Sequence, residues 1–233
     1  MSQPRRPRRS QAGGYARGDE TRQRIIAAAV KLFGEHGFAG ASTRDIAAAA
    51  GVNAPALQYY FENKEGVYLA CAEFIADDIR TRFEPAMRHA AGVLKGEGDM
   101  HALIDAFMSL HEVMLDMVLS DPQASNRRLF VAREVAGEEP RVASTLLEQR
   151  LKQPLNKLRL TLLARISGTT TRDPVTRIRL LTLKGQILPF FYPPGGCLDE
   201  LGWKAIDAAK GALLKATVME QTHTLLESWQ SSR

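Results

Sequence analysis

Helix-capping residues follow one another closely in the N-terminal third of the chain. Ser42, Asn53 and Asn63 each precede a short stretch with the apolar spacing of a helix, and Ser and Asn satisfy the free N–H groups of a helix's first turn. Asp45 stands where the capping box that Ser42 opens commonly has Glu. Pro55 falls in the first turn after Asn53, where a missing N–H costs nothing. This segment is therefore predicted to form short helices joined by tight turns.

A longer helix is predicted before these short ones. Ile25, Ala29, Leu32 and Phe33 lie on one apolar stripe, and Gly37 is placed to end the helix. The short helices would pack on this stripe through a second set of apolar residues: Ile46, Ala50, Val52, Leu57 and Phe61.

Helical periodicity continues to the end of the chain, punctuated by Gly, Pro, Asn and Asp. We expect further helices over 64–83, ending before Pro85, and over 99–119, 126–136, 140–168 with a kink at Pro154, 174–191 and 202–229. The fold class predicted is all-α. An N-terminal three-helix domain at 19–75 precedes a C-terminal helical bundle at 76–233.

The spacing at 43–60 is that of a helix-turn-helix. The first helix would be Thr43–Ala50, the turn residues 51–53, and the second helix Ala54–Tyr60. This motif needs two short helices and a second helix that exposes side chains to the major groove of DNA. Four residues of the second helix have no evident role in core packing: Pro55, Ala56, Gln58 and Tyr59.

The run STRDIAAAAGVNAPALQYYFENKEGVY resembles the signature of the TetR/AcrR family of regulators, in which an aromatic pair and a capped Lys-Glu follow the recognition helix. The resemblance implies phosphate contacts from Thr43, Arg44, Tyr60 and Lys64, and base-edge contacts from Pro55, Ala56, Gln58 and Tyr59. Gln58 departs from the family, which commonly has Tyr there; Gln can read an adenine edge. Operator preferences of relatives should therefore not be transferred.

Shorter motifs in the C-terminal half resemble the CecR branch of the same family. They are Arg133-Glu134, the stretch 183–188 and Leu201-Gly202-Trp203. The resemblance implies a homodimer, formed by the last two helices, that binds a palindromic double-stranded DNA operator. It also implies repression, relieved by a small-molecule effector. The candidate interface or core positions, which the sequence does not separate, are Leu180, Leu181, Leu183, Ile187, Leu188, Leu213, Leu214 and Val218.

Apolar bulk with a few polar tips suggests an effector pocket in this bundle. The candidate residues are Phe107, Met108, His111, Met114, Leu115, Phe130, Arg133, Gln186 and Phe190. The same residues also suit an ordinary core, because Met is a common core filler. Arg133 and Glu134 are charges in an apolar helix, and such charges either pair with other groups or bind a ligand.

The net charge of +5 permits nucleic-acid binding, and its distribution is uneven. Residues 1–18 carry five arginines and no acid among Pro, Gly, Ser and Gln, which predicts a disordered basic arm. Such an arm either adds contacts to DNA or is a solvated tail.

Other function classes find little support. Cys71 and Cys197 lie far apart and outside any C-x-x-C pattern, and His101 with Asp105 would supply only two metal ligands. We therefore expect no metal, no cofactor and no enzyme activity. The arginine-rich start lacks the apolar stretch of an export signal, and no apolar run is long enough for a membrane span, so a cytoplasmic protein is expected. The remaining alternative is a helical adaptor that binds other proteins.

Overall fold

The computed structural model describes residues 12–96, 98–119, 124–137, 139–191 and 195–230. Within these ranges the regular structure is helical, as predicted. The helices are α1 (Ala12–Gly40), α2 (Thr43–Ala49), α3 (Ala54–Tyr60), α4 (Lys64–Lys95), α5 (Met100–Leu119), α6 (Ala124–Ala136), α7 (Arg141–Leu147), the π-helical turn η1 (Glu148–Lys152), α8 (Gln153–Ser167), α9 (Pro174–Gly185), α10 (Leu188–Phe191), α11 (Gly195–Glu200) and α12 (Ala208–Gln230).

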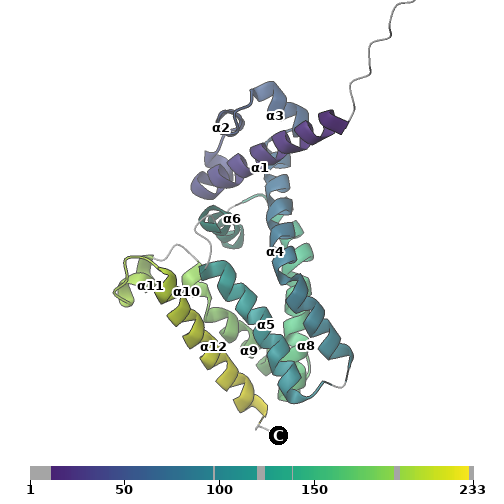
Figure 1. Cartoon of the computed structure of the whole chain (residues 1–233), viewed down its shortest axis with the longest axis vertical. Coiled ribbons are helices and arrows are strands. Elements are labelled where there is room, and N and C mark those ends of the chain that lie inside the picture. The colour runs from purple at the N-terminus through teal and green to yellow at the C-terminus, as the bar shows by residue number, and fades with distance from the viewer. Residues whose placement is uncertain (1–11, 97, 120–123, 138, 192–194, 231–233) are drawn as a thin grey trace, which may run out of the picture.

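The long helix α4 connects the two ends of the molecule. Figure 1 shows α1, α2 and α3 gathered at one end of α4, and α5, α8, α9 and α12 forming a bundle toward its other end. Helix α6 lies between the two groups and packs against α1. The short N-terminal helices are therefore joined to the bundle through both α4 and α6.

The predicted caps are confirmed. Ser42 Oγ accepts from the N–H of Asp45 at 3.1 Å, Asn53 Oδ1 accepts from Ala56 at 2.9 Å, and Asn63 Oδ1 accepts from Gly66 at 2.8 Å. The Asp45 carboxylate accepts from the Ser42 hydroxyl rather than from the Ser42 backbone. One half of the capping box is thus replaced by a bond between the two side chains.

Gly37 interrupts α1 as expected, with φ at +72° inside the helix. A side chain there is disfavoured for two reasons. The left-handed backbone favours glycine, and an added Cβ would lie 3.0 Å from the Glu139 carboxylate and 3.2 Å from the Arg133 guanidinium. The kink is therefore held by residues that are distant in the sequence.

Two predictions about α1 and α4 need correction. The helix expected to stop before Pro85 continues to Lys95, because Phe83, Ala86 and Ala90 around Pro85 are buried and their packing offsets the missing hydrogen bond. At the N-terminus, the structure describes residues 12–18 of the expected arm as the first turns of α1. Residues 1–11 of that arm lie outside the described residues.

The C-terminal helices follow the prediction with shifted boundaries. Pro154 stands at the start of α8, directly after the π-helical turn η1, so the expected kink is a change of helix type. The helix expected over 174–191 is divided at residues 186–187 into α9 and α10. The last helix starts at Ala208 rather than Gly202, because Asp207 caps it by accepting from Lys210 N–H at 2.9 Å.

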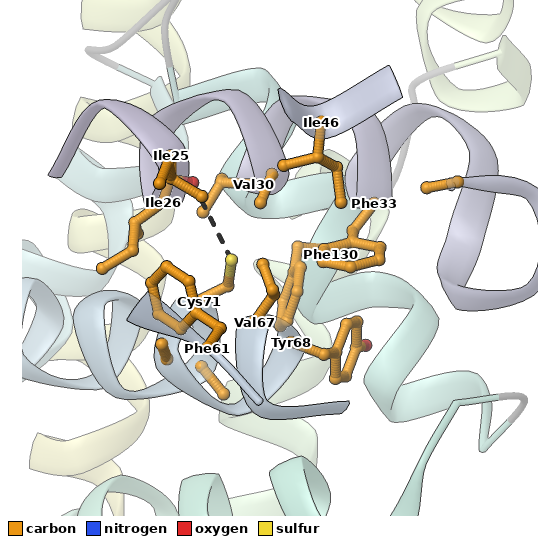
Figure 2. Close-up of a cluster of buried hydrophobic side chains, with 14 of the residues drawn as sticks. Ile25, Ile26, Val30, Phe33, Ile46, Phe61, Val67, Tyr68, Cys71 and Phe130 are labelled. Atoms are coloured by element: carbon orange, nitrogen blue, oxygen red, sulfur yellow. Dashed lines mark hydrogen bonds between the residues drawn. The ribbon is translucent and has the colours of Figure 1, made fainter. Parts of the chain in front are cut away.

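The N-terminal core draws on more of the chain than residues 19–75. Ile25, Phe33 and Ile46 are fully buried together, as predicted. The same cluster includes Phe130 from α6, which Figure 2 shows among the side chains of α1 and α4. Ala143 and Leu147 of α7 complete it. Among the described residues, no helix is both long and apolar enough to cross a membrane.

Candidate DNA interface and C-terminal polar cluster

A tight turn and a shared buried core hold α3 against α2. Gly51 turns the chain with φ at +66°, and Val52 N–H donates to Ala47 O at 2.9 Å. Leu57 is the buried anchor of α3 and packs in the same core as Ile46. Leu57 buries one face of α3, and the opposite face of the helix remains uncovered.

The predicted base-edge residues lie on that uncovered face. Pro55 and Gln58 are exposed, Ala56 is half-buried, and Tyr59 is 84% exposed. An aromatic ring this exposed on a short helix is not part of the core, so it is available to a partner. Tyr60, predicted as a phosphate contact, packs partly into the core and holds Tyr59 edge-on at 5.2 Å between ring centroids.

An open hollow of about 470 Å³ lies beside α3. The start of α2 and the start of α4 form its two sides, and it brings together Thr43, Gln58 and Lys64 of the predicted set. Lys64 Nζ donates to Ala39 O at 3.4 Å and lies 4.5 Å from the centroid of the Phe38 ring. Arg44 is exposed on α2. The starts of α2 and α4 and one cation, Lys64, therefore line this hollow.

Part of the predicted effector set meets in the C-terminal bundle. The Thr222 hydroxyl of α12 donates to Gln186 Oε1 at 2.7 Å and lies 3.3 Å from His111 Nε2 of α5. Phe107 stacks on His111 with 6.1 Å between ring centroids. Four further members lie in or against the neighbouring apolar clusters: Met108, Met114, Leu115 and Phe190.

Phe130 and Arg133 lie apart from this group. Phe130 stacks on Tyr68 at 4.6 Å within the N-terminal core. Arg133 donates to the carbonyl oxygens of Gly34 and Glu35, each at 3.0 Å, near the end of the straight part of α1, where a cation is favoured. Phe130 therefore packs α6 against α4, and Arg133 joins α6 to α1.

Glu134 is also an interhelical residue. Its carboxylate is buried and accepts from the Tyr68 hydroxyl and the Ser144 hydroxyl, each at 2.6 Å. Burial, the hydrogen bond and the charge of Glu134 raise the pKa of Tyr68. Tyr68 therefore stays a neutral donor, and Glu134 links α4, α6 and α7.

The sequence prediction missed Arg159 and Thr222. Arg159 is only 2% exposed in the middle of α8, on the same helix face as Leu155, Leu162 and Ile166. The sequence already shows its helical spacing with these apolar residues. A charged residue on a core stripe is the signal that could have identified it.

The structure separates the core positions of the last helices from the exposed ones. Leu180, Leu183, Ile187, Leu214 and Val218 are buried within the protomer. Leu181, Leu188 and Leu213 are 64%, 50% and 60% exposed, and Val175 and Ile178 add to the exposed apolar surface of α9. An exposed apolar surface on two neighbouring helices is typical of a protein interface.

Comparisons with known proteins agree with this architecture. The family of bacterial regulatory proteins called tetR matches residues 25–71, and the C-terminal domain of the HTH-type transcriptional dual regulator CecR matches residues 103–228. CecR of Shigella flexneri is 33% identical over 203 residues, which cover 87% of this chain and 89% of CecR. The regulatory protein RaaS of Mycobacterium tuberculosis is 45% identical over 65 residues, 28% of this chain and 30% of RaaS.

Solved structures share the fold at low sequence identity. AibR in complex with isovaleryl coenzyme A and operator DNA superposes with a TM-score of 0.61 at 14% identity, over 86% of this chain and 97% of AibR. FadR of Bacillus subtilis in complex with stearoyl-CoA gives 0.58 at 18% identity, over 87% and 97%. The chain belongs to the TetR family of bacterial transcriptional regulators, and its C-terminal half is of the CecR type.

Proposed function

We propose that this chain is a homodimeric repressor that binds a palindromic operator and leaves it when a small molecule enters the C-terminal bundle. The observation that carries the proposal is the uncovered face of α3, where Gln58 and Tyr59 project from a helix anchored by Leu57. A recognition helix needs this combination of a rigid attachment to the core and side chains that are free to contact DNA.

Phosphate contacts would flank the recognition helix on both sides of the hollow. Arg44 on α2 and Lys64 on α4 supply cations, and the N–H groups at the two helix starts favour an anion. Thr43 and Tyr60 would add hydroxyl donors. Lys64 lies over the Phe38 ring and would move toward a phosphate at small cost, because its one hydrogen bond within the described part of the chain is 3.4 Å long.

Base readout would rest on Pro55, Ala56, Gln58 and Tyr59. Gln58 carries the amide that pairs with adenine N6 and N7 in the major groove. The other three offer apolar contacts and one hydroxyl. Specificity would then depend on few direct base contacts, supplemented by DNA shape.

A dimer would present two recognition helices to two half-sites. The exposed apolar surface of α9 and α12, marked by Leu181 and Leu213, is the surface that we assign to the partner copy. An isologous pairing of this surface would bury it and relate the two α3 helices by a two-fold axis.

An effector in the bundle would cause release of the DNA through α4 and α6 together. Helix α4 runs from Lys64, beside the hollow, into the bundle core at Phe83 and Ala90. Helix α6 holds the end of α1 through Arg133. An effector that prefers one packing of the bundle would shift the distance between the two recognition helices by population shift.

A mobility-shift assay on the DNA upstream of the chain's own gene tests the proposal. We expect salt-sensitive binding, and we expect Lys64→Ala to lower the slope of log affinity against log salt by about one unit, because each lysine–phosphate ion pair releases about one counterion. The control is Lys157→Ala, an exposed lysine on α8, which should leave the slope unchanged. An unchanged slope in Lys64→Ala would contradict the phosphate role.

A reporter fused to the bound DNA tests repression. Deleting the gene should raise expression of the reporter. Since the relative from Shigella flexneri is named a dual regulator, a fall in expression on deletion would replace repression by activation and leave the DNA-binding role intact.

A further inference from the structure

Arg159 is a buried cation without an acidic partner in the described part of the chain. It is 2% exposed, and its one hydrogen bond among the described residues runs from Nη2 to Leu110 O at 3.1 Å. Its Nε–H is buried and has no acceptor there. Buried charges are normally paired with an opposite charge, and a buried donor without an acceptor calls for an explanation.

The titratable groups whose pKa values Arg159 shifts are a histidine and a lysine, His111 and Lys184. Burial and the charge of Arg159 lower the pKa of His111 to about 3, so the imidazole is neutral at pH 7. Arg159 itself stays protonated, because burial lowers its pKa only to about 10. The pKa of Lys184 is lowered by burial and by Arg159. Glu148 acts on the pKa of Lys184 in the opposite sense, whereas no acid of the described residues perturbs the pKa of Arg159.

Polar acceptors and donors on three other helical segments face the same region. His111 on α5, Gln186 after α9 and Thr222 on α12 form one hydrogen-bonded group. The surroundings are apolar, with Phe107, Leu183 and Leu226 fully or almost fully buried in one cluster. A positive charge, a polar group and an apolar enclosure thus occur together at the centre of the bundle.

We infer that the C-terminal bundle binds an amphipathic organic anion, whose acidic group pairs with the Arg159 guanidinium in place of the missing carboxylate. The free Nε–H and an Nη group of a guanidinium form a fork that matches a carboxylate or a phosphate. The inference rests on the proposed function in one respect only, in that this anion would be the effector.

The apolar body of the anion would replace side-chain packing of the bundle. Met108 and Met114 of α5 are half-buried and pack against the apolar clusters on either side of His111. Unbranched thioether side chains rearrange at low cost. The space for an apolar body would therefore open beside the polar group without breaking a helix.

Thermal unfolding of the full-length protein with matched probes tests the inference. The probes are octanoate, decanoate, cinnamate and naphthoate, each beside its neutral primary amide, and octyl phosphate. We expect at least one acid to raise the Tm of the wild type by at least about 2 °C more than its amide does. If octyl phosphate alone raises the Tm by this amount, measured against octanamide, the anion is a phosphate ester rather than a carboxylate.

Variants at Arg159 connect the effect to this residue. Arg159→Met should abolish the preference for the acid and, without any probe, raise the Tm by at least about 2 °C, because an unpaired buried charge is removed. Arg159→Lys should keep the preference with weaker binding. The control Lys157→Met on α8 should behave as the wild type. The inference is wrong if no anion outperforms its neutral counterpart, or if Arg159→Met keeps the preference.

Failure of this inference and failure of the proposed function are distinguishable. DNA binding without any probe, measured by mobility shift, should be the same in Arg159→Met and in the wild type. Loss of the acid preference with intact DNA binding would leave the regulator role standing. Acid binding in a protein that binds no DNA would leave the anion site standing and remove its role as effector site.

Discussion

At the scale of single residues, the buried polar side chains carry interactions that hold distant segments together. Glu134 accepts from Tyr68 on α4 and from Ser144 on α7, so one carboxylate joins segments far apart in the sequence. Its burial is tolerated because both bonds are short and charge-assisted. Removing one donor would leave the carboxylate with an unmet hydrogen bond.

Tyr68→Phe is expected to lower the free energy of unfolding by about 1–3 kcal/mol, because Glu134 would lose a donor without gaining water. Urea denaturation followed by circular dichroism measures the change. Tyr59→Phe removes a hydroxyl from a side chain that is 84% exposed and should change the free energy of unfolding by less than about 0.5 kcal/mol. Equal stability of Tyr68→Phe and the wild type would argue against the bond.

His111 should make stability depend on pH below neutrality. Its folded pKa of about 3 lies below the ordinary value of 6.5, so its contribution is fully present above pH 6.5 and is lost as pH falls toward 3. Relative to His111→Gln, the wild type should lose about 2 kcal/mol of unfolding free energy between pH 7.5 and pH 5. Urea titrations at both pH values measure this difference. His89→Gln, at an exposed position on α4, should show no such difference, and a similar pH response in both variants would contradict the role of His111.

Single residues also show how far sequence reasoning reaches. The caps at Ser42, Asn53 and Asn63 are predictable because capping depends on neighbours along the chain. Arg133 and Phe130 suit an effector pocket by their spacing, whereas in the structure they contact α1 and α4. Periodicity gives the buried face of a helix but not the helix that it meets.

At the scale of helices, the contact between α1 and α6 depends on the absence of a side chain at Gly34. A Cβ at Gly34 would lie 2.5 Å from the backbone oxygen of Asn126. Backbone atoms cannot move aside as a flexible side chain does. The two helices therefore approach each other more closely than any larger residue would allow.

Gly34→Ala should push α6 away from α1 and destabilise the protein by about 1–3 kcal/mol. The matched control is Gly92→Ala in α4, where an added Cβ meets nothing within 4 Å, and which should stabilise by about 0.4–1 kcal/mol through the unfolded chain. Thermal and urea unfolding of both variants measure the difference. Stabilisation by both alanines would show that the close contact does not hold in solution.

Helix boundaries are less predictable than helix existence. Pro85 normally ends a helix, but burial of its neighbours keeps α4 continuous to Lys95, and such tertiary packing is invisible to local propensity. The pattern favours a start of the last helix at Gly202, whereas the capping residue is Asp207. A choice between two plausible starts depends on which side chain reaches the first turn.

At the scale of the whole molecule, the assignment of α9 and α12 to the partner copy can be tested by charge. Leu181→Glu with Leu213→Glu should place acids in the assigned interface and yield a monomer, because like charges without partners oppose association. Analytical ultracentrifugation measures the mass in solution. Val142→Glu, at a 47% exposed apolar position on α7, should remain dimeric. The double variant should bind the operator roughly 100-fold or more weakly, since a second half-site no longer binds as part of one molecule; a dimeric double variant would refute the assigned surface.

The place of Phe130 in the N-terminal core limits how such a protein can be recombined. The ring comes from α6 and stacks on Tyr68 of α4 among residues of α1, as Figure 2 shows. A chimera that joins the first three helices and α4 to an unrelated sensor would leave a hole where this ring lies. A chimera between relatives therefore has to keep α6 together with the N-terminal helices. Otherwise it needs another aromatic residue in the place of Phe130. In this protein the N-terminal helices and α6 share one core.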